Sequence, residues 1–167
     1  EVIIVIGANP TINHPVAATF IKNATKAGSK LIVMDPRGQA LSRHATHMIQ
    51  FKPSSDVAML NGMINTIIGE GLYDQQYIDG FTEGFEELKK STTEFTPERM
   101  SAICGIEPNT IRKMARIYAK AESALIFWGM GVSQHTHGTD NARCLISLAL
   151  ICGHVGRAGS GLHPLRG

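Results

Sequence analysis

The stretch that decides the fold class is EVIIVIGANPTINHP, residues 1–15. Its residues 2–6 are five consecutive β-branched, apolar side chains, which is typical of a short strand buried on both faces of a parallel sheet. A glycine follows directly. The proline at position 15 suits the first position of a helix, because its missing N–H would have no partner there. The stretch therefore predicts a strand, a glycine-containing loop and then a helix over about residues 15–27.

Outward from this stretch, strand and helix patterns alternate through most of the chain. Residues 73–121 differ, because they are more polar, hold much of the charge and predict several short helices. We interpret them as a helical excursion within a single domain, residues 1–167. The alternation predicts an α/β fold with a doubly wound, mainly parallel sheet and helices on both faces, as in Rossmann-like domains. The further expected strands are residues 31–34, 47–51 and 124–128, and the further long helices are one capped by Ser54 or Ser55 and one over residues 139–154.

Composition excludes several classes of protein. The chain has 167 residues with a net charge of +2, which is too small to indicate binding to nucleic acid or to a membrane surface. Its apolar runs are far shorter than the ~20 residues that span a membrane, so no membrane insertion is expected. Three cysteines without C-x-x-C spacing favour neither a zinc site nor a disulfide framework and indicate a reducing compartment, the cytoplasm.

Both ends look like interruptions of a longer fold. The chain starts directly on a strand without an initiator methionine, and it stops within GSGLHPLRG, residues 159–167, which has the composition of a site loop. We therefore expect a fragment of a larger protein.

Three of the expected strands end in loops that suit a nucleotide. These loops are GANP (7–10), DPRG (35–38) and GMGVSQ (129–134). Because ligands of such sheets bind at the carboxyl ends of the strands, the loops predict one site. Glycine lets the backbone approach a phosphate, Asp35 can accept hydrogen bonds from a ribose or base, and Arg37 can pair with a phosphate or stack on a purine. None of the loops matches the G-x-G-x-x-G fingerprint.

Simpler interpretations stay open for these residues. Asn9 and Asn13 could be turn and cap residues, and Asp35 could cap a turn. His135 and His137 lie in a glycine-rich loop without a third ligand, so we expect no metal site there.

Five segments occur in order across nearly the whole chain: GANPTINHP, VMDPRG, PSSD, WGMGVSQHTHGTDNAR and GRAGSGLHPLRG. Together they resemble the molybdopterin oxidoreductase family and, within it, the molybdenum- or tungsten-dependent formate dehydrogenases. The resemblance implies a metal held between two molybdopterin guanine dinucleotides, one bound by each of two related α/β domains, of which this chain is one. The cofactor-binding residues that it implies are Gly7, Asn9, Asn13, Asp35, Arg37, Ser55, Asp56, Met130, Gly131 and Gln134.

The resemblance also implies a catalytic residue and further parts of the enzyme. Arg166 matches the arginine that orients formate, although it could also be a surface arginine in a tail. The family's metal-ligating cysteine or selenocysteine and its iron–sulfur segment lie upstream of the matching region, and Cys104, Cys144 and Cys152 do not match those positions. We therefore expect this fragment alone to be inactive, and the full-length enzyme to act with formate and with electron-transfer subunits or domains.

Other classes remain as alternatives. A cofactor-free relative in a respiratory NADH dehydrogenase would not need Asp35, Arg37, Gln134 and Arg166 together. Another molybdopterin oxidoreductase, such as a nitrate reductase, is less similar in the last two segments. A plain nicotinamide- or thiamine-diphosphate-type nucleotide domain is the third alternative.

Overall fold

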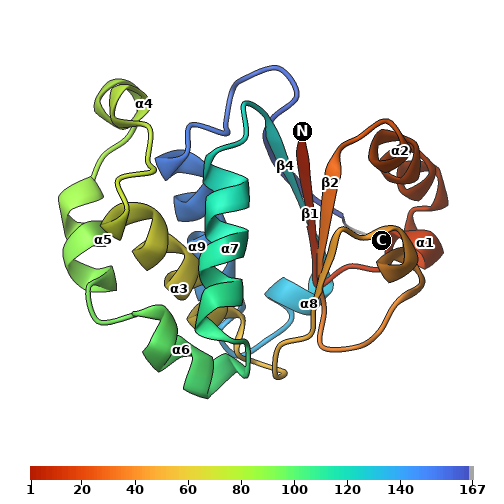
Figure 1. Ribbon diagram of the computed structural model, residues 1–167, viewed down its shortest axis with the longest axis horizontal. Coiled ribbons are helices and arrows are strands. Elements are labelled where there is room, and N and C mark those ends of the chain that lie inside the picture. Colours follow the sequence, from red (N-terminus) through yellow and green to blue (C-terminus); the bar gives the residue numbers. More distant parts are fainter. Residues whose placement is uncertain (166–167) are drawn as a thin grey trace.

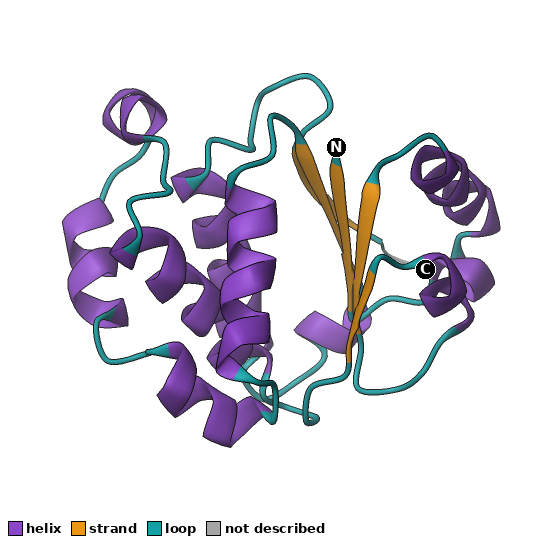
Figure 2. Cartoon of the chain, in the orientation of Figure 1, coloured by secondary structure: helices purple, strands orange, loops and turns teal. Residues whose placement is uncertain are grey.

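The computed structural model describes residues 1–165 of the 167-residue chain. Its centre is a five-stranded sheet in the order β3-β2-β1-β4-β5 (Figures 1 and 2), and every neighbouring pair is parallel. The predicted doubly wound parallel sheet is confirmed. The strands are β1 (Val2–Ile6), β2 (Lys30–Met34), β3 (His47–Ile49), β4 (Ala124–Trp128) and β5 (Gly161–Pro164).

Strand β5 was not predicted, and its position explains why. It pairs only with β4 at the edge of the sheet, where glycine and proline are tolerated because one side of the strand needs no ladder hydrogen bonds. Strand β3 ends at Ile49, two residues before the predicted end.

Helices cover both faces of the sheet (Figure 1). On one side lie α1 (Pro10–Asn13), α2 (Pro15–Lys26) and the 3-10 helix η1 (Ala40–His44). On the other side lies a larger helical layer that includes α3 (Asp56–Gly69) and α9 (Gly138–Ile151).

Alternate residues of the strands enter two separate cores, because successive side chains of a strand point to opposite faces. On β1, Ile4 and Ile6 join the core under the larger helical layer. Ile3 and Val5 join the smaller core, where Ile21 of α2 packs. The five apolar residues of the opening stretch therefore serve both layers at once.

The predicted excursion, residues 73–121, contains helices and the loops that connect them. It consists of α4 (Gln75–Phe81), α5 (Phe85–Thr92), α6 (Pro97–Cys104) and α7 (Pro108–Ala119), and no strand interrupts it. Asp74 caps α4 by accepting from the Tyr77 N–H at 2.9 Å.

Several further local expectations differ from the structure, and the loop predicted after β1 contains the short helix α1. The segment predicted as a loop after β4 contains a short helix, α8 (Met130–Ser133). α9 ends at Ile151 rather than at residue 154, and Cys152 follows as its C-cap. Ser55 is the N-cap residue of α3, but its hydroxyl donates backward to the Lys52 carbonyl at 2.6 Å instead of capping the helix. Within residues 1–165, no helix combines the length and the apolar character needed to cross a bilayer.

Candidate functional site

A cleft of about 540 Å³ opens at the carboxyl ends of the central strands. Its walls come from the loops that follow β1, β2, β3 and β4 and from Leu165, which follows β5, so five segments meet at the carboxyl ends of the strands. This volume lies within the range of roughly 300–1,000 Å³ that is usual for ligand pockets. Eight of the ten residues predicted to bind a cofactor line it: Gly7, Asn9, Asn13, Asp35, Arg37, Asp56, Met130 and Gly131.

Two glycines let the loops after β1 and β4 interlock at this cleft. The Gly131 N–H donates to the Gly7 carbonyl at 3.0 Å, and the Gly129 N–H donates to the Ile6 carbonyl at 3.2 Å. A Cβ atom on Gly131 would lie 2.6 Å from the Gly7 carbonyl oxygen. Gly7 itself has a φ of 56°, a left-handed conformation that favours glycine. These glycines therefore allow close approach of one loop to the other.

The carboxylate of Asp35 is almost completely buried and holds the second loop in place. One oxygen, Oδ1, accepts from the Arg37 N–H at 2.8 Å, and the other, Oδ2, accepts from Nε2 of Gln39 at 3.3 Å. The same Gln39 amide donates to the Ala8 carbonyl at 2.9 Å. Asp35 and Gln39 thus tie the loop after β2 to the loop after β1.

Gln39 is a site residue that the sequence analysis missed. It is 8% exposed, and its Oε1 atom has no hydrogen-bond partner within residues 1–165. Because both neighbours of Nε2 are acceptors, only the amide nitrogen can occupy that position. A glutamine after the DPRG segment is not part of any known sequence motif, so the role of Gln39 could not be predicted from the sequence.

Arg37 presents the most accessible charge of the cleft. Its side chain is 84% exposed, and Nε lies 3.6 Å from Oδ1 of Asp35. The backbone of Arg37 is therefore fixed by Asp35 while its guanidinium remains open to an incoming anion, which a planar, permanently charged group binds well.

Asp56 supplies a second carboxylate in the first turn of α3. Burial raises its pKa above the ordinary aspartate value, and the negative charge of Asp35 acts in the same direction, while its own backbone N–H and the neighbouring His135 oppose the shift. His135 was not among the predicted cofactor residues. It lines the cleft, with Nε2 2.6 Å from the Gly131 carbonyl oxygen.

Two of the predicted cofactor-binding residues do not line the cleft. Ser55 and Gln134 are adjacent to the cleft in sequence but are not among the residues that line it. Arg166 lies outside the described residues. Within residues 1–165, no cluster of three histidine, cysteine or acidic side chains could hold a metal ion.

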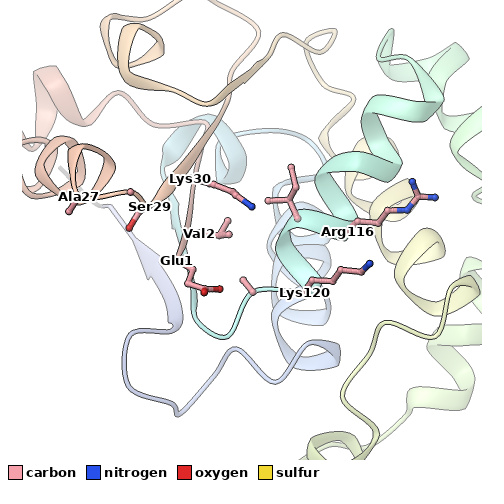
Figure 3. Close-up of a pocket in the computed structure, with 10 residues that line it drawn as sticks. Glu1, Val2, Ala27, Ser29, Lys30, Arg116 and Lys120 are labelled. Carbon is pink, nitrogen blue, oxygen red and sulfur yellow. The ribbon is translucent and has the colours of Figure 1, made fainter.

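A second cavity, of about 550 Å³, lies at the amino ends of β1 and β2 (Figure 3). It is lined by both signs of charge, including Glu1, Lys30 and Lys120. The guanidinium of Arg116 is already paired with both carboxylate oxygens of Glu70, at 2.8 and 2.7 Å. Because open α/β sheets bind ligands at the carboxyl ends of their strands, we assign the functional site to the first cleft.

A parallel sheet in this strand order, with a polar cleft at the carboxyl ends of its strands, defines a doubly wound α/β domain, a class that binds ligands at that position. Comparison with known proteins identifies the family, because the family described as "Molybdopterin oxidoreductase" matches residues 1–166. The chain belongs to the molybdopterin oxidoreductase family.

Its relatives are longer proteins. The chain is 43% identical over 167 residues to the F420-dependent formate dehydrogenase subunit alpha of Methanocaldococcus jannaschii, covering 100% of the chain and 25% of the relative. It is 42% identical to formate dehydrogenase H of Escherichia coli, covering 23% of that protein. The chain therefore spans about a quarter of the length of these relatives.

A solved structure shows the same fold with a different name. Acetylene hydratase from Pelobacter acetylenicus superposes with a TM-score of 0.90 at 31% sequence identity, over 96% of this chain and 22% of that protein. The fold is thus shared by family members whose names denote different reactions.

Proposed function

We propose that this chain is one α/β domain of the catalytic subunit of a formate dehydrogenase and that it binds one of two molybdopterin guanine dinucleotides. The observation that carries the proposal is the cleft itself, where eight residues implied by the family resemblance lie together. Similarity over the full chain to two formate dehydrogenases supports the same activity.

The residues of the cleft fit the nucleotide end of such a cofactor. The open guanidinium of Arg37 suits the diphosphate. Guanine presents N–H donors on one edge, and the carboxylate of Asp56 is an acceptor that suits them. Gly7, Gly131 and Met130 would line the cleft on the side of the pterin, and the two glycines would leave it free of side chains there. When bound, the cofactor would supply the molybdenum or tungsten centre at which formate is oxidised to carbon dioxide.

Ser55 and Gln134 take supporting roles in this proposal. The hydroxyl of Ser55 holds the Lys52 carbonyl at the start of α3. The Gln134 N–H donates to the Met130 carbonyl at 2.8 Å and closes the short helix α8. Both residues fix backbone that borders the cleft.

Arg166 is proposed to orient the substrate. Formate is a small carboxylate, and an arginine can hold a carboxylate through two parallel hydrogen bonds. The full-length protein would also carry an iron–sulfur cluster and the metal-ligating cysteine or selenocysteine. It would pass electrons to partner subunits or domains, and it would act in the cytoplasm.

A hydratase is the second candidate, because the matching solved structure is named acetylene hydratase. The test uses the full-length protein. Metal analysis and fluorescence of the extracted cofactor should show molybdenum or tungsten together with a pterin, and formate should reduce an artificial dye. A pterin with acetylene hydration and no formate-dependent dye reduction would favour the hydratase, while absence of both metal and pterin would overturn the proposal in favour of a cofactor-free relative.

A further inference from the structure

The candidate site carries more negative than positive fixed charge. Among residues 1–165, the cleft is lined by the carboxylates of Asp35 and Asp56 and by one permanently charged cation, the guanidinium of Arg37. A dinucleotide brings a further negative charge on each phosphate of its diphosphate. Because a nearby anion favours the protonated form of a titratable group, binding of a diphosphate favours any group of the cleft that can gain a proton.

Two histidines, His14 and His135, line the same cleft, and histidine is the side chain that most readily gains a proton near neutral pH. The ring of His135 has a defined orientation. Its Nε2 atom lies 2.6 Å from the carbonyl oxygen of Gly131, which can only accept, so Nε2 carries a proton. Its Nδ1 atom has no hydrogen-bond partner among residues 1–165. Protonation therefore makes Nδ1 a second donor and leaves the bond to Gly131 intact.

The charges around His135 are coupled to its protonation. Asp56 is close enough to interact with it, because burial raises the pKa of Asp56 and His135 opposes this shift. The other titratable or charged groups on the surrounding segments are Asp35, Arg37, His14, His137, Asp140 and Arg143. A diphosphate adds negative charge to this set and strengthens the hold of His135 on a proton.

We infer that the cleft binds the diphosphate of its nucleotide together with a proton and that His135 takes up this proton. By linkage, the affinity for the diphosphate then rises as the pH falls, until the ring is already protonated in the empty cleft. The inference rests on the proposed function in taking the ligand to be a dinucleotide diphosphate. It adds a dependence of cofactor binding on pH and a residue responsible for it.

The test titrates the full-length protein, prepared without its cofactor, with guanosine diphosphate mannose. The diphosphate of this probe is esterified at both ends, as in the dinucleotide, so the probe itself does not titrate near neutral pH. Calorimetry in two buffers of different ionisation enthalpy, neither of them phosphate, gives the number of protons taken up on binding. We expect uptake of up to about one proton near neutral pH, with affinity falling by up to about tenfold per pH unit as the pH rises.

Variants at two neighbouring histidines separate a charged role from a structural one. His135→Gln should bind the probe without proton uptake and with an affinity that does not depend on pH. His135→Lys, which is charged in both states, should restore the affinity but not the proton uptake, a result that a purely structural role would not produce. His137→Gln is the matched control, because the His137 side chain is 71% exposed in the same loop and does not line the cleft.

Each outcome decides the inference. Proton uptake that persists in His135→Gln, that is lost in His14→Gln instead, or that is absent from a wild-type protein that binds the probe overturns it. If the probe does not bind, the rate at which the loaded protein releases its pterin in dilute urea is measured at about pH 6 and about pH 8, on either side of the usual histidine pKa. Slower release at the acid pH in the wild type and in His137→Gln, but not in His135→Gln, supports the inference, and any other pattern overturns it. Failure of the proposed function is seen separately, as absence of pterin from the purified protein, and it removes this inference as well.

Discussion

Replacement of Gly131 by alanine tests how closely the loops after β1 and β4 interlock. The new Cβ would lie 2.6 Å from the Gly7 carbonyl oxygen, 2.9 Å from its Cα and 3.0 Å from its carbonyl carbon. All three are backbone atoms, which cannot move aside as the end of a long side chain can. The loops must therefore separate.

The expected cost is the sum of two effects. Forcing an extra methyl group into a packed site costs about 1–3 kcal/mol. Separation of the loops also weakens the hydrogen bond from the Gly131 N–H to the Gly7 carbonyl, worth about 0.5–1.5 kcal/mol. Gly131→Ala should therefore lower the free energy of unfolding by about 2–4 kcal/mol, a large share of the roughly 5–15 kcal/mol that stabilises a typical domain.

Equilibrium unfolding in urea, followed by circular dichroism, measures this change. Gly80→Ala is the control, because Gly80 lies within α4 and, apart from its chain neighbours and the nearby backbone of that helix, no atom lies within 4 Å of its added Cβ. That substitution should stabilise the protein by up to about 1 kcal/mol through helix propensity. If Gly131→Ala changes the free energy of unfolding no more than the control does, the loops do not interlock as described.

Four further predictions address single residues. Ser54 adopts a φ of 64°, a left-handed conformation that strains a residue with a Cβ atom. Ser54→Gly should therefore raise the free energy of unfolding by about 1 kcal/mol. A loss of stability would show that Ser54 is not strained. Burial raises the pKa of Asp56, so ionisation of its carboxyl group destabilises the folded state once the pH exceeds the ordinary aspartate pKa. Asp56→Asn should therefore raise the melting temperature at pH 7. Thermal melts at acid pH, where Asp56 is protonated in both states, should show no such increase. Burial raises the pKa of Cys144 to about 11 and that of Cys152 to about 12, so both thiols should resist iodoacetamide at pH 8 until the protein unfolds; rapid alkylation of the folded protein would show that they are accessible thiolates. Asp35→Ala in the full-length protein should lower its pterin content, because the Asp35 carboxylate would accept a hydrogen bond from the ribose or base of the dinucleotide. Such a bond to a charged group is worth about 1.5–3 kcal/mol. Unchanged pterin content would leave Asp35 with only its role in the turn.

Much of the site could be predicted because its residues follow strands directly. Asp35 directly follows β2, and Gly129 directly follows β4. In a parallel sheet those positions must meet at one edge, whatever the details of the loops. The identity of the cofactor could not be reached in this way, and it came from the family resemblance.

The sequence by itself determined the parallel sheet, the helical excursion and the edge at which the loops gather, because apolar runs and helix periodicity are local properties of the chain. Only the tertiary structure decided the details that connect distant residues. The amide of Gln39 reaches Ala8, 31 positions away, and Gly131 packs against Gly7. Strand β5 exists because β4 offers it a free edge. These contacts depend on how separate segments approach in space, and residues so far apart leave no local pattern from which their contact could be predicted.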